Sequence, residues 1–220
     1  MRFRFTHLLA PAMLATVAAC SSSTNGLTAT SQVRLSQMPI TAAQPMVTGI
    51  NADVSGGAAA IAADTVKSLT VMVDSISYLP QADTADSASA ASWVSLPLGS
   101  PVQIDLSTLP TDSASAIVLA SGTVPVGTYG MVRLFVDSAT IAFKGPIALG
   151  GALTLKAATT YAVTIPSSAQ TGIKTHVTFT VSADQGGAAN AAYLLFDPAA
   201  TYANVTVTGT GNVMLAPVIH

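Results

Sequence analysis

The sequence holds a single cysteine, Cys20, directly behind a short apolar leader. Arg2 and Arg4 open the chain, an apolar run covers 8–17, and small residues precede the thiol. A charged start, an apolar stretch and small residues before a cleavage point are the features of a secretory signal. The run is too short for a membrane span, which needs about 20 apolar residues. We therefore expect export of the chain and removal of a signal peptide, residues 1–19.

A lone thiol in an exported chain needs a partner or a modification, because it forms no intramolecular disulfide. The stretch Val-Ala-Ala-Cys at 17–20 resembles the lipobox of bacterial lipoproteins, which implies cleavage before Cys20 and acylation, for instance with palmitate. Each buried methylene contributes about 0.8 kcal/mol, so two or three chains hold a protein firmly in a bilayer. Ser21, and not an aspartate, follows Cys20, which implies the outer membrane with its face left open. The alternative is an ordinary cleaved signal whose cysteine has no role.

The rest of the chain offers few groups for catalysis. A serine nucleophile needs a histidine base, and the histidines beyond the leader are His176 and His220. No Gly-x-Ser-x-Gly elbow surrounds any serine. All ten acidic residues are aspartates, and two of them could serve a hydrolase if they met in space. We expect no enzyme, with a carboxylate-dependent hydrolase as the weaker alternative.

Metal binding is not indicated either. Zinc needs three or four ligands, and no second histidine or cysteine is spaced to join His176. Asp83 and Asp86 lie in a loop-like stretch that lacks both the ligand number and the glycine of a calcium loop. We expect neither a metal nor a cofactor.

Charge and composition exclude one class of partner and disfavour another. Removal of Arg2 and Arg4 leaves six of the eight basic side chains against ten aspartates, a formal charge of −4. Nucleic-acid binding needs clustered Lys and Arg to displace counterions, so no nucleic acid is expected. Aromatic residues make up 5% of the chain, which disfavours sugar binding that depends on ring stacking.

The sequence favours strands over helices. Glutamate, a good helix former, is absent, whereas Val, Ile and Thr are stiff at the first side-chain torsion. Strand patterns are expected at 32–35, 45–54, 66–78, 93–96, 102–106, 116–120, 128–143, 153–155, 161–165, 173–181, 193–196, 203–208 and 213–219. We expect an anchored tether at 20–30 and a single domain at 31–220, since the length suits one core.

The longest strand pattern, 128–143, has apolar residues on both faces and should be central. It contains Arg133, and an isolated buried charge is very costly. This arginine should therefore either reach the rim with its head group or pair with a carboxylate in a structural ion pair. Asp105 and Asp197 are the partners to test. Trp93, the single tryptophan, is expected to be a core or rim anchor.

Four stretches together resemble a known family. They are Gly-Thr-Tyr-Gly-Met-Val-Arg-Leu at 127–134, Ile-Pro-Ser-Ser-Ala-Gln-Thr-Gly-Ile-Lys at 165–174, Phe-Asp at 196–197 and Leu-Ala-Pro-Val-Ile at 215–219. In this order they resemble an uncharacterised family of bacterial lipoproteins, a domain of unknown function of the DUF4382 type, over about 65–219. The resemblance implies an all-β, two-sheet antiparallel β-sandwich, prealbumin-like or immunoglobulin-like, on a lipid anchor. It brings no catalytic residues.

These observations favour a cell-envelope lipoprotein whose domain binds or supports other envelope components without catalysis. Its expected partners are the bilayer, through acylated Cys20, and an envelope protein or polysaccharide. The alternative is a periplasmic carrier with an apolar pocket between the sheets. A filled core would favour the binding module, an open cavity the carrier, and carboxylates clustered in a cleft the hydrolase.

Overall fold

The computed structural model describes residues 26–39, 58–59, 61–83, 93–148, 154–166, 171–183, 185–203, 205–208 and 211–220. The predicted signal peptide, Cys20, most of the tether, the strand expected at 45–54 and most of the loop that contains Asp86 lie outside the described residues. The described part is all-β apart from short 3-10 turns and one helix of five residues, α1 (Pro198–Tyr202).

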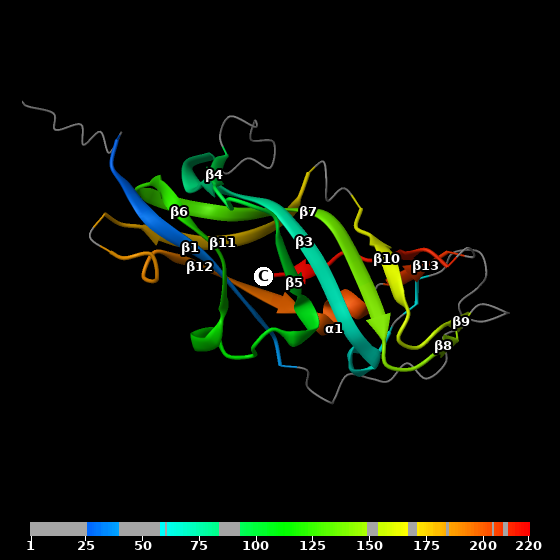
Figure 1. Cartoon of the computed structure of the whole chain (residues 1–220). Coiled ribbons are helices and arrows are strands. Elements are labelled where there is room, and N and C mark those ends of the chain that lie inside the picture. The colour runs from blue at the N-terminus through cyan, green and yellow to red at the C-terminus, as the bar shows by residue number, and fades with distance from the viewer. Residues whose placement is uncertain are drawn as a thin grey trace, which may run out of the picture.

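The strands form two large sheets and one small one (Figure 1). Their bounds are β1 (Thr28–Gln37), β2 (Ala58–Ala59), β3 (Val66–Pro80), β4 (Val94–Leu96), β5 (Val102–Asp105), β6 (Ile117–Pro125), β7 (Gly127–Phe143), β8 (Ile147–Ala148), β9 (Thr154–Leu155), β10 (Thr160–Thr164), β11 (Ile173–Val181), β12 (Ala191–Asp197), β13 (Val205–Val207), β14 (Val213–Met214) and β15 (Val218–Ile219). The four-stranded sheet has the order β15-β12-β1-β6. The nine-stranded sheet has the order β2-β13-β14-β10-β7-β3-β4, with β11 also paired to β7 and β5 to β3. Strands β8 and β9 pair with each other.

The longest strands, β3 with 15 residues and β7 with 17, run side by side through the length of the larger sheet (Figure 1). On its other edge, β7 pairs with β11 along its first half and with β10 along its second half. Several register shifts interrupt the β3–β7 ladder. Bulges increase the local twist of a strand, so the direction of the β3–β7 pair changes along its length. The same pair can therefore align β11 at one end of the sheet and β10 at the other.

The two large sheets bury their inner faces in one hydrophobic cluster. The smaller sheet contributes Val33, Leu35 and Phe196, and the larger sheet contributes Leu69 and Ile141. Each of these five side chains is at most 1% exposed. Full burial of such a side chain stabilises the fold by about 1.5–3 kcal/mol, so the contact between the sheets contributes substantially to the stability.

Polar contacts fix how the two sheets lie against each other. The Ser31 hydroxyl on β1 donates to the Asn190 carbonyl at 2.6 Å and lies 3.2 Å from the Tyr78 hydroxyl on β3. The buried Asn190 amide donates to the carbonyls of Thr30 and Ser182. Buried polar groups carry a penalty unless they are paired, so these bonds specify one alignment of the sheets.

The expectation of purely antiparallel sheets is wrong. Strands β1 and β12 run parallel, with Gln32 opposite Ala191, and so do β10 and β14, with Val163 opposite Val213. An alternating pattern shows which face of a strand is buried but not the direction of its neighbour. Parallel neighbours need long connections, and most of the chain lies between β1, which ends at Gln37, and β12, which begins at Ala191.

Tyr78 makes the stability of the fold sensitive to high pH. Burial raises the pKa of its hydroxyl to about 12, although the hydrogen bond to Ser31 acts in the opposite direction. The unfolded chain loses this proton near pH 10, so the folded state holds it where the unfolded state does not. The contribution of Tyr78 to the free energy of unfolding is complete below pH 10 and is lost between about pH 10 and 12, by up to about 3 kcal/mol.

We expect Tyr78→Phe to flatten the fall in the free energy of unfolding between pH 9 and 11.5, measured by urea denaturation. The exposed Tyr193, changed to Phe, is the matched control and should leave the wild-type slope intact. An unaltered slope in Tyr78→Phe would contradict the assignment.

Candidate functional site

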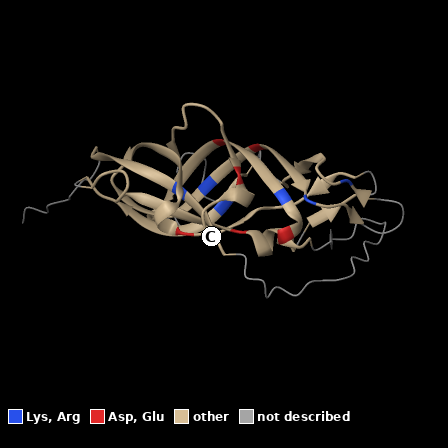
Figure 2. Cartoon of the chain, turned by 60° about the horizontal axis from the view of Figure 1, so that its bottom comes forward, with Lys and Arg blue, Asp and Glu red and all other residues tan. Residues whose placement is uncertain are grey.

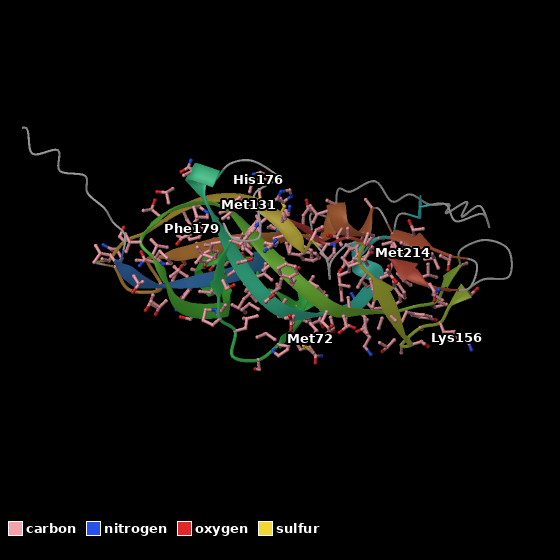
Figure 3. All side chains as sticks on the ribbon, turned by 90° about the horizontal axis from the view of Figure 1, so that it is seen from above. Met72, Met131, Lys156, His176, Phe179 and Met214 are labelled. Carbon is pink, nitrogen blue, oxygen red and sulfur yellow. The ribbon has the colours of Figure 1, made fainter. Side chains whose placement is uncertain are left out.

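Strands β3, β7 and β11 present a common outer face near the start of β7. The register places three rows across it: Leu79, Met131 and His176; Ser77, Arg133 and Lys174; and Ser75 with Phe135. Residues directly opposite each other in an antiparallel pair share a face, and Figure 3 shows Met131 beside His176. We call the surface formed by Ser77, Trp93, Arg133, Phe135, Lys174 and His176 the Arg133 patch.

Two aromatic rings hold the Arg133 guanidinium. Its Cζ lies 4.0 Å from the centre of the Trp93 ring and 4.6 Å from that of Phe135. Its Nε donates to the Ser77 Oγ at 3.3 Å. Burial lowers the pKa of Arg133 from its ordinary value, yet an arginine stays charged in proteins. The rings and Ser77 therefore fix the plane of a permanent cation.

Gly172 lets the loop before β11 approach the stem of Arg133. Its φ is +69°, and a Cβ at this position would lie 2.8 Å from the Arg133 Cγ and 2.9 Å from the Leu134 carbonyl oxygen. A side chain would meet both a strained backbone and a clash. Two of the stretches noted in the sequence, 127–134 and 165–174, thus meet at this arginine.

Charged residues are few on this protein (Figure 2), and the patch contains two basic ones, Arg133 and Lys174. Lys174 lies directly across from Arg133, and like charges in this position destabilise a sheet. Among the described residues, no carboxylate forms an ion pair with either side chain, and the terminal Nη groups of Arg133 have no hydrogen-bond partner. Lys174 and His176 are exposed, so an anion from outside can reach the patch.

The structure does not bring Arg133 together with Asp105. This carboxylate accepts hydrogen bonds from the backbone N–H of Leu69 at 3.1 Å and of Ser107 at 3.0 Å, at the end of β5. Asp105 pairs with Thr70 of β3, whereas Arg133 pairs with Ser77. Seven residues of strand separate the two positions, about 23 Å.

Asp197 has a different role as well. Its Oδ1 accepts from the Ala200 N–H at 2.9 Å and begins helix α1, with Pro198 in the first turn. Its Oδ2 lies 3.8 Å from the His220 Nε2. The predicted partners of Arg133 are therefore both used in backbone caps, and aromatic rings take the place of the expected ion pair.

A shallow hollow of about 220 Å³ adjoins the Arg133 patch. Its lining residues are Asp74, Ser75, Phe135, Val136 and Asp137. Both aspartates are skipped in the β3–β7 register, so each is a bulge residue, and both are exposed. Phe135 lines the hollow, and its ring lies against the Arg133 guanidinium, so the hollow and the Arg133 patch share this residue.

In the described part of the chain, a small apolar cavity lies between the two large sheets. The cavity between the sheets measures about 10 Å³ and has an entirely apolar lining that includes Leu35, Val136 and Ile219. Such a volume holds about one water molecule. In the described ranges, no three His, Cys, Asp or Glu side chains gather where a metal ion could bind. No helix in these ranges has the length and hydropathy to cross a membrane.

The outer face of the smaller sheet carries a second arginine. Arg34 lies in a row between Val118 of β6 and Tyr193 of β12, and its Nε donates to the Gln32 Oε1 at 3.1 Å. Like Arg133 it is half-buried. No second cation lies opposite Arg34, which makes it a matched control for Arg133.

Sequence reasoning singled out Arg133, Trp93 and His176 separately but not their common surface. The alternation of Lys174 and His176 with apolar residues is visible in the sequence and indicates that both lie on one face of the strand. The pairing of Lys174 with Arg133 depends on register, which no local pattern encodes. The bulges at Asp74 and Asp137, which leave both residues without a ladder partner, had no signal in the sequence.

We expect Arg133→Met to uncover Trp93, because the guanidinium no longer lies on its ring. Acrylamide should quench the fluorescence of this single tryptophan more strongly than in the wild type. The free energy of unfolding should fall by about 1–2 kcal/mol, and less in Arg133→Lys, which keeps the cation. Arg34→Met is the control and should be quenched like the wild type. If Arg133→Met is also quenched only as strongly as the wild type, the stacked arrangement is refuted.

Comparison with protein families places the chain in a known group. The family model described as domain of unknown function (DUF4382) matches residues 59–217. No curated protein and no solved structure matched the chain. The match begins at β2 and extends to the residue before β15, and it contains every member of the Arg133 patch. The chain therefore belongs to the family defined by this domain of unknown function, DUF4382.

Proposed function

We propose that this protein is a lipoprotein of the bacterial cell envelope, anchored through Cys20 in the outer membrane, whose domain is a non-catalytic binding module. In this proposal the two large sheets are the layers of a β-sandwich, supported by their shared hydrophobic cluster. The likeness to prealbumin or immunoglobulin domains stays a prediction.

The Arg133 patch is the observation that carries the proposed binding role. A cation held by two rings and a hydroxyl has lost most of its conformational freedom before any partner arrives. The neighbouring Lys174 raises the energy of the unliganded surface through like-charge repulsion. An anionic partner would relieve this repulsion. An arginine with a purely structural role would not require a second cation beside it.

The small interior cavity supports a binding surface over a carrier. A carrier of small molecules usually encloses its ligand in a pocket of roughly 300–1,000 Å³. The cavity between the sheets, at about 10 Å³, is far below that size. Binding at the outer face needs no such space.

The anchor would keep the domain close to the membrane. Strand β1 begins at Thr28, inside the stretch 20–30 that was expected to be tether. Eight residue steps separate Thr28 from Cys20, and a chain extends by at most about 3.3–3.6 Å per residue. The smaller sheet would therefore start within about 30 Å of the acylated cysteine.

The anchor is tested by Cys20→Ala in a Gram-negative host. We expect the variant to lose metabolic labelling with palmitate and to move to the soluble fraction, because no thiol remains to carry a lipid. Ser21→Ala is the neighbouring control and should retain both the label and the membrane fraction. Membrane association that persists in Cys20→Ala would disprove the anchor.

The binding role is tested by capture of partners from native membranes. The acylated protein is crosslinked in place, purified, and analysed for attached proteins and glycans. We expect a reproducible envelope component that is recovered with wild type and Arg34→Gln but not with Arg133→Gln. Reproducible absence of any attached component would argue against a binding module.

A further inference from the structure

The chemistry of the outer face identifies a class of ligand. We propose that the Arg133 patch and the adjoining hollow together bind a carboxylated saccharide of the envelope, with its carboxylate on Arg133 and Lys174 and its hydroxyl groups over Asp74 and Asp137. This inference deepens the proposed binding role and rests on it.

The Arg133 end of the surface suits a carboxylate. The Nε of Arg133 is bound to Ser77, while its terminal Nη groups have no partner among the described residues. A guanidinium presents these donors in a rigid plane that matches a planar carboxylate, with two parallel hydrogen bonds. The exposed Lys174, directly opposite on β11, supplies a second positive charge for the same anion.

The other end of the surface suits hydroxyl groups. The hollow carries the carboxylates of Asp74 and Asp137 and the side chain of Ser75, all from the region of the bulges. An ionised carboxylate only accepts hydrogen bonds, so it selects donors such as sugar hydroxyls. At about 220 Å³ the hollow is smaller than an enclosed ligand pocket and suits a ring that rests on the surface.

The arrangement favours a saccharide over a lipid surface. Anionic membranes attract several basic side chains that project together, at about 1 kcal/mol for each near the surface. Here the guanidinium is half-buried beside Trp93 and Phe135, and two aspartates adjoin it. A flat anionic surface would meet both signs of charge. A uronic acid carries a negative group and hydroxyl donors on one ring and matches both ends.

The test uses the full acylated chain in a neutral detergent, with trigalacturonic acid as the probe and galactotriose as its uncharged counterpart. Binding is followed by calorimetry and by the fluorescence of Trp93. We expect saturable binding of the acid, with galactotriose at least about tenfold weaker because the charge-assisted hydrogen bonds are missing. Equal affinity for the two sugars, or no saturable binding of the acid, overturns the proposal.

Three variants locate the bound carboxylate. Arg133→Gln should weaken binding of the acid about tenfold or more, and Lys174→Gln should weaken it to a smaller extent. Arg34→Gln, on the other sheet, should bind like the wild type. Thermal melting checks that each variant is folded, and Lys174→Gln, at an exposed position, keeps the test valid if Arg133→Gln unfolds. Loss of affinity in Arg34→Gln that equals the loss in Arg133→Gln would overturn the assigned site.

The double variant Asp74→Ala, Asp137→Ala separates hydroxyl recognition from simple attraction. Removal of two negative charges alone should strengthen the binding of an anion. If the aspartates accept bonds from the sugar hydroxyls, binding of trigalacturonic acid should instead weaken by several-fold. Tighter binding would overturn the proposed orientation.

Three outcomes distinguish a wrong saccharide site from a wrong binding module. If crosslinking captures a partner protein that still binds Arg133→Gln, the binding module stands and the saccharide site falls. If the full-length Cys20→Ala chain sediments with phosphatidylglycerol vesicles in an Arg133-dependent manner and ignores the sugar, the ligand class is wrong. If the sugar binds but membranes yield no attached component, the site stands and the wider role falls.

Discussion

The pairing of β3 with β7 is the constraint on which the rest of the structure depends. One strand of 17 residues serves as the partner of β11 at one end and of β10 at the other, so both halves of the larger sheet are aligned by a single ladder. The inner residues of these strands enter the shared core, while the outer residues carry the charged surface. A slip of one residue in the ladder would exchange these two faces. The core and the Arg133 patch are therefore set by the same register.

The bulges give that ladder a chemical role. Val73 and Val136 face the core, so alternation already directs the next residues, Asp74 and Asp137, outward, and the bulges leave both without a partner in the ladder. At the patch itself, aromatic rings replace carboxylates as the neighbours of Arg133. The two rings hold the guanidinium in place but, unlike carboxylates, do not neutralise its charge. The protein thus keeps an uncompensated positive site next to a negative one.

The sequence predicted the all-β class and most of the strands, because alternation over 128–143 and 173–181 is a local signal. Parallel pairing escaped prediction, since β1 finds its partner β12 far along the chain. The short helix α1 was missed because its Asp197 cap and Pro198 lie between two strand patterns. For the site, the charge of Arg133 was recognised but its neighbours were not, because register and loop approach at Gly172 bring them together.

Strand β1 lies outside the span of the family match, yet it occupies an interior position between β12 and β6 in the smaller sheet. Its ladders with both neighbours extend over most of its 10 residues. A tension applied at Thr28 and directed along the strand would act on these hydrogen bonds in shear, so many must rupture together. Peeling them apart one at a time would need far less force. An N-terminal attachment would therefore enter the domain through a strand whose two ladders resist tension along its length.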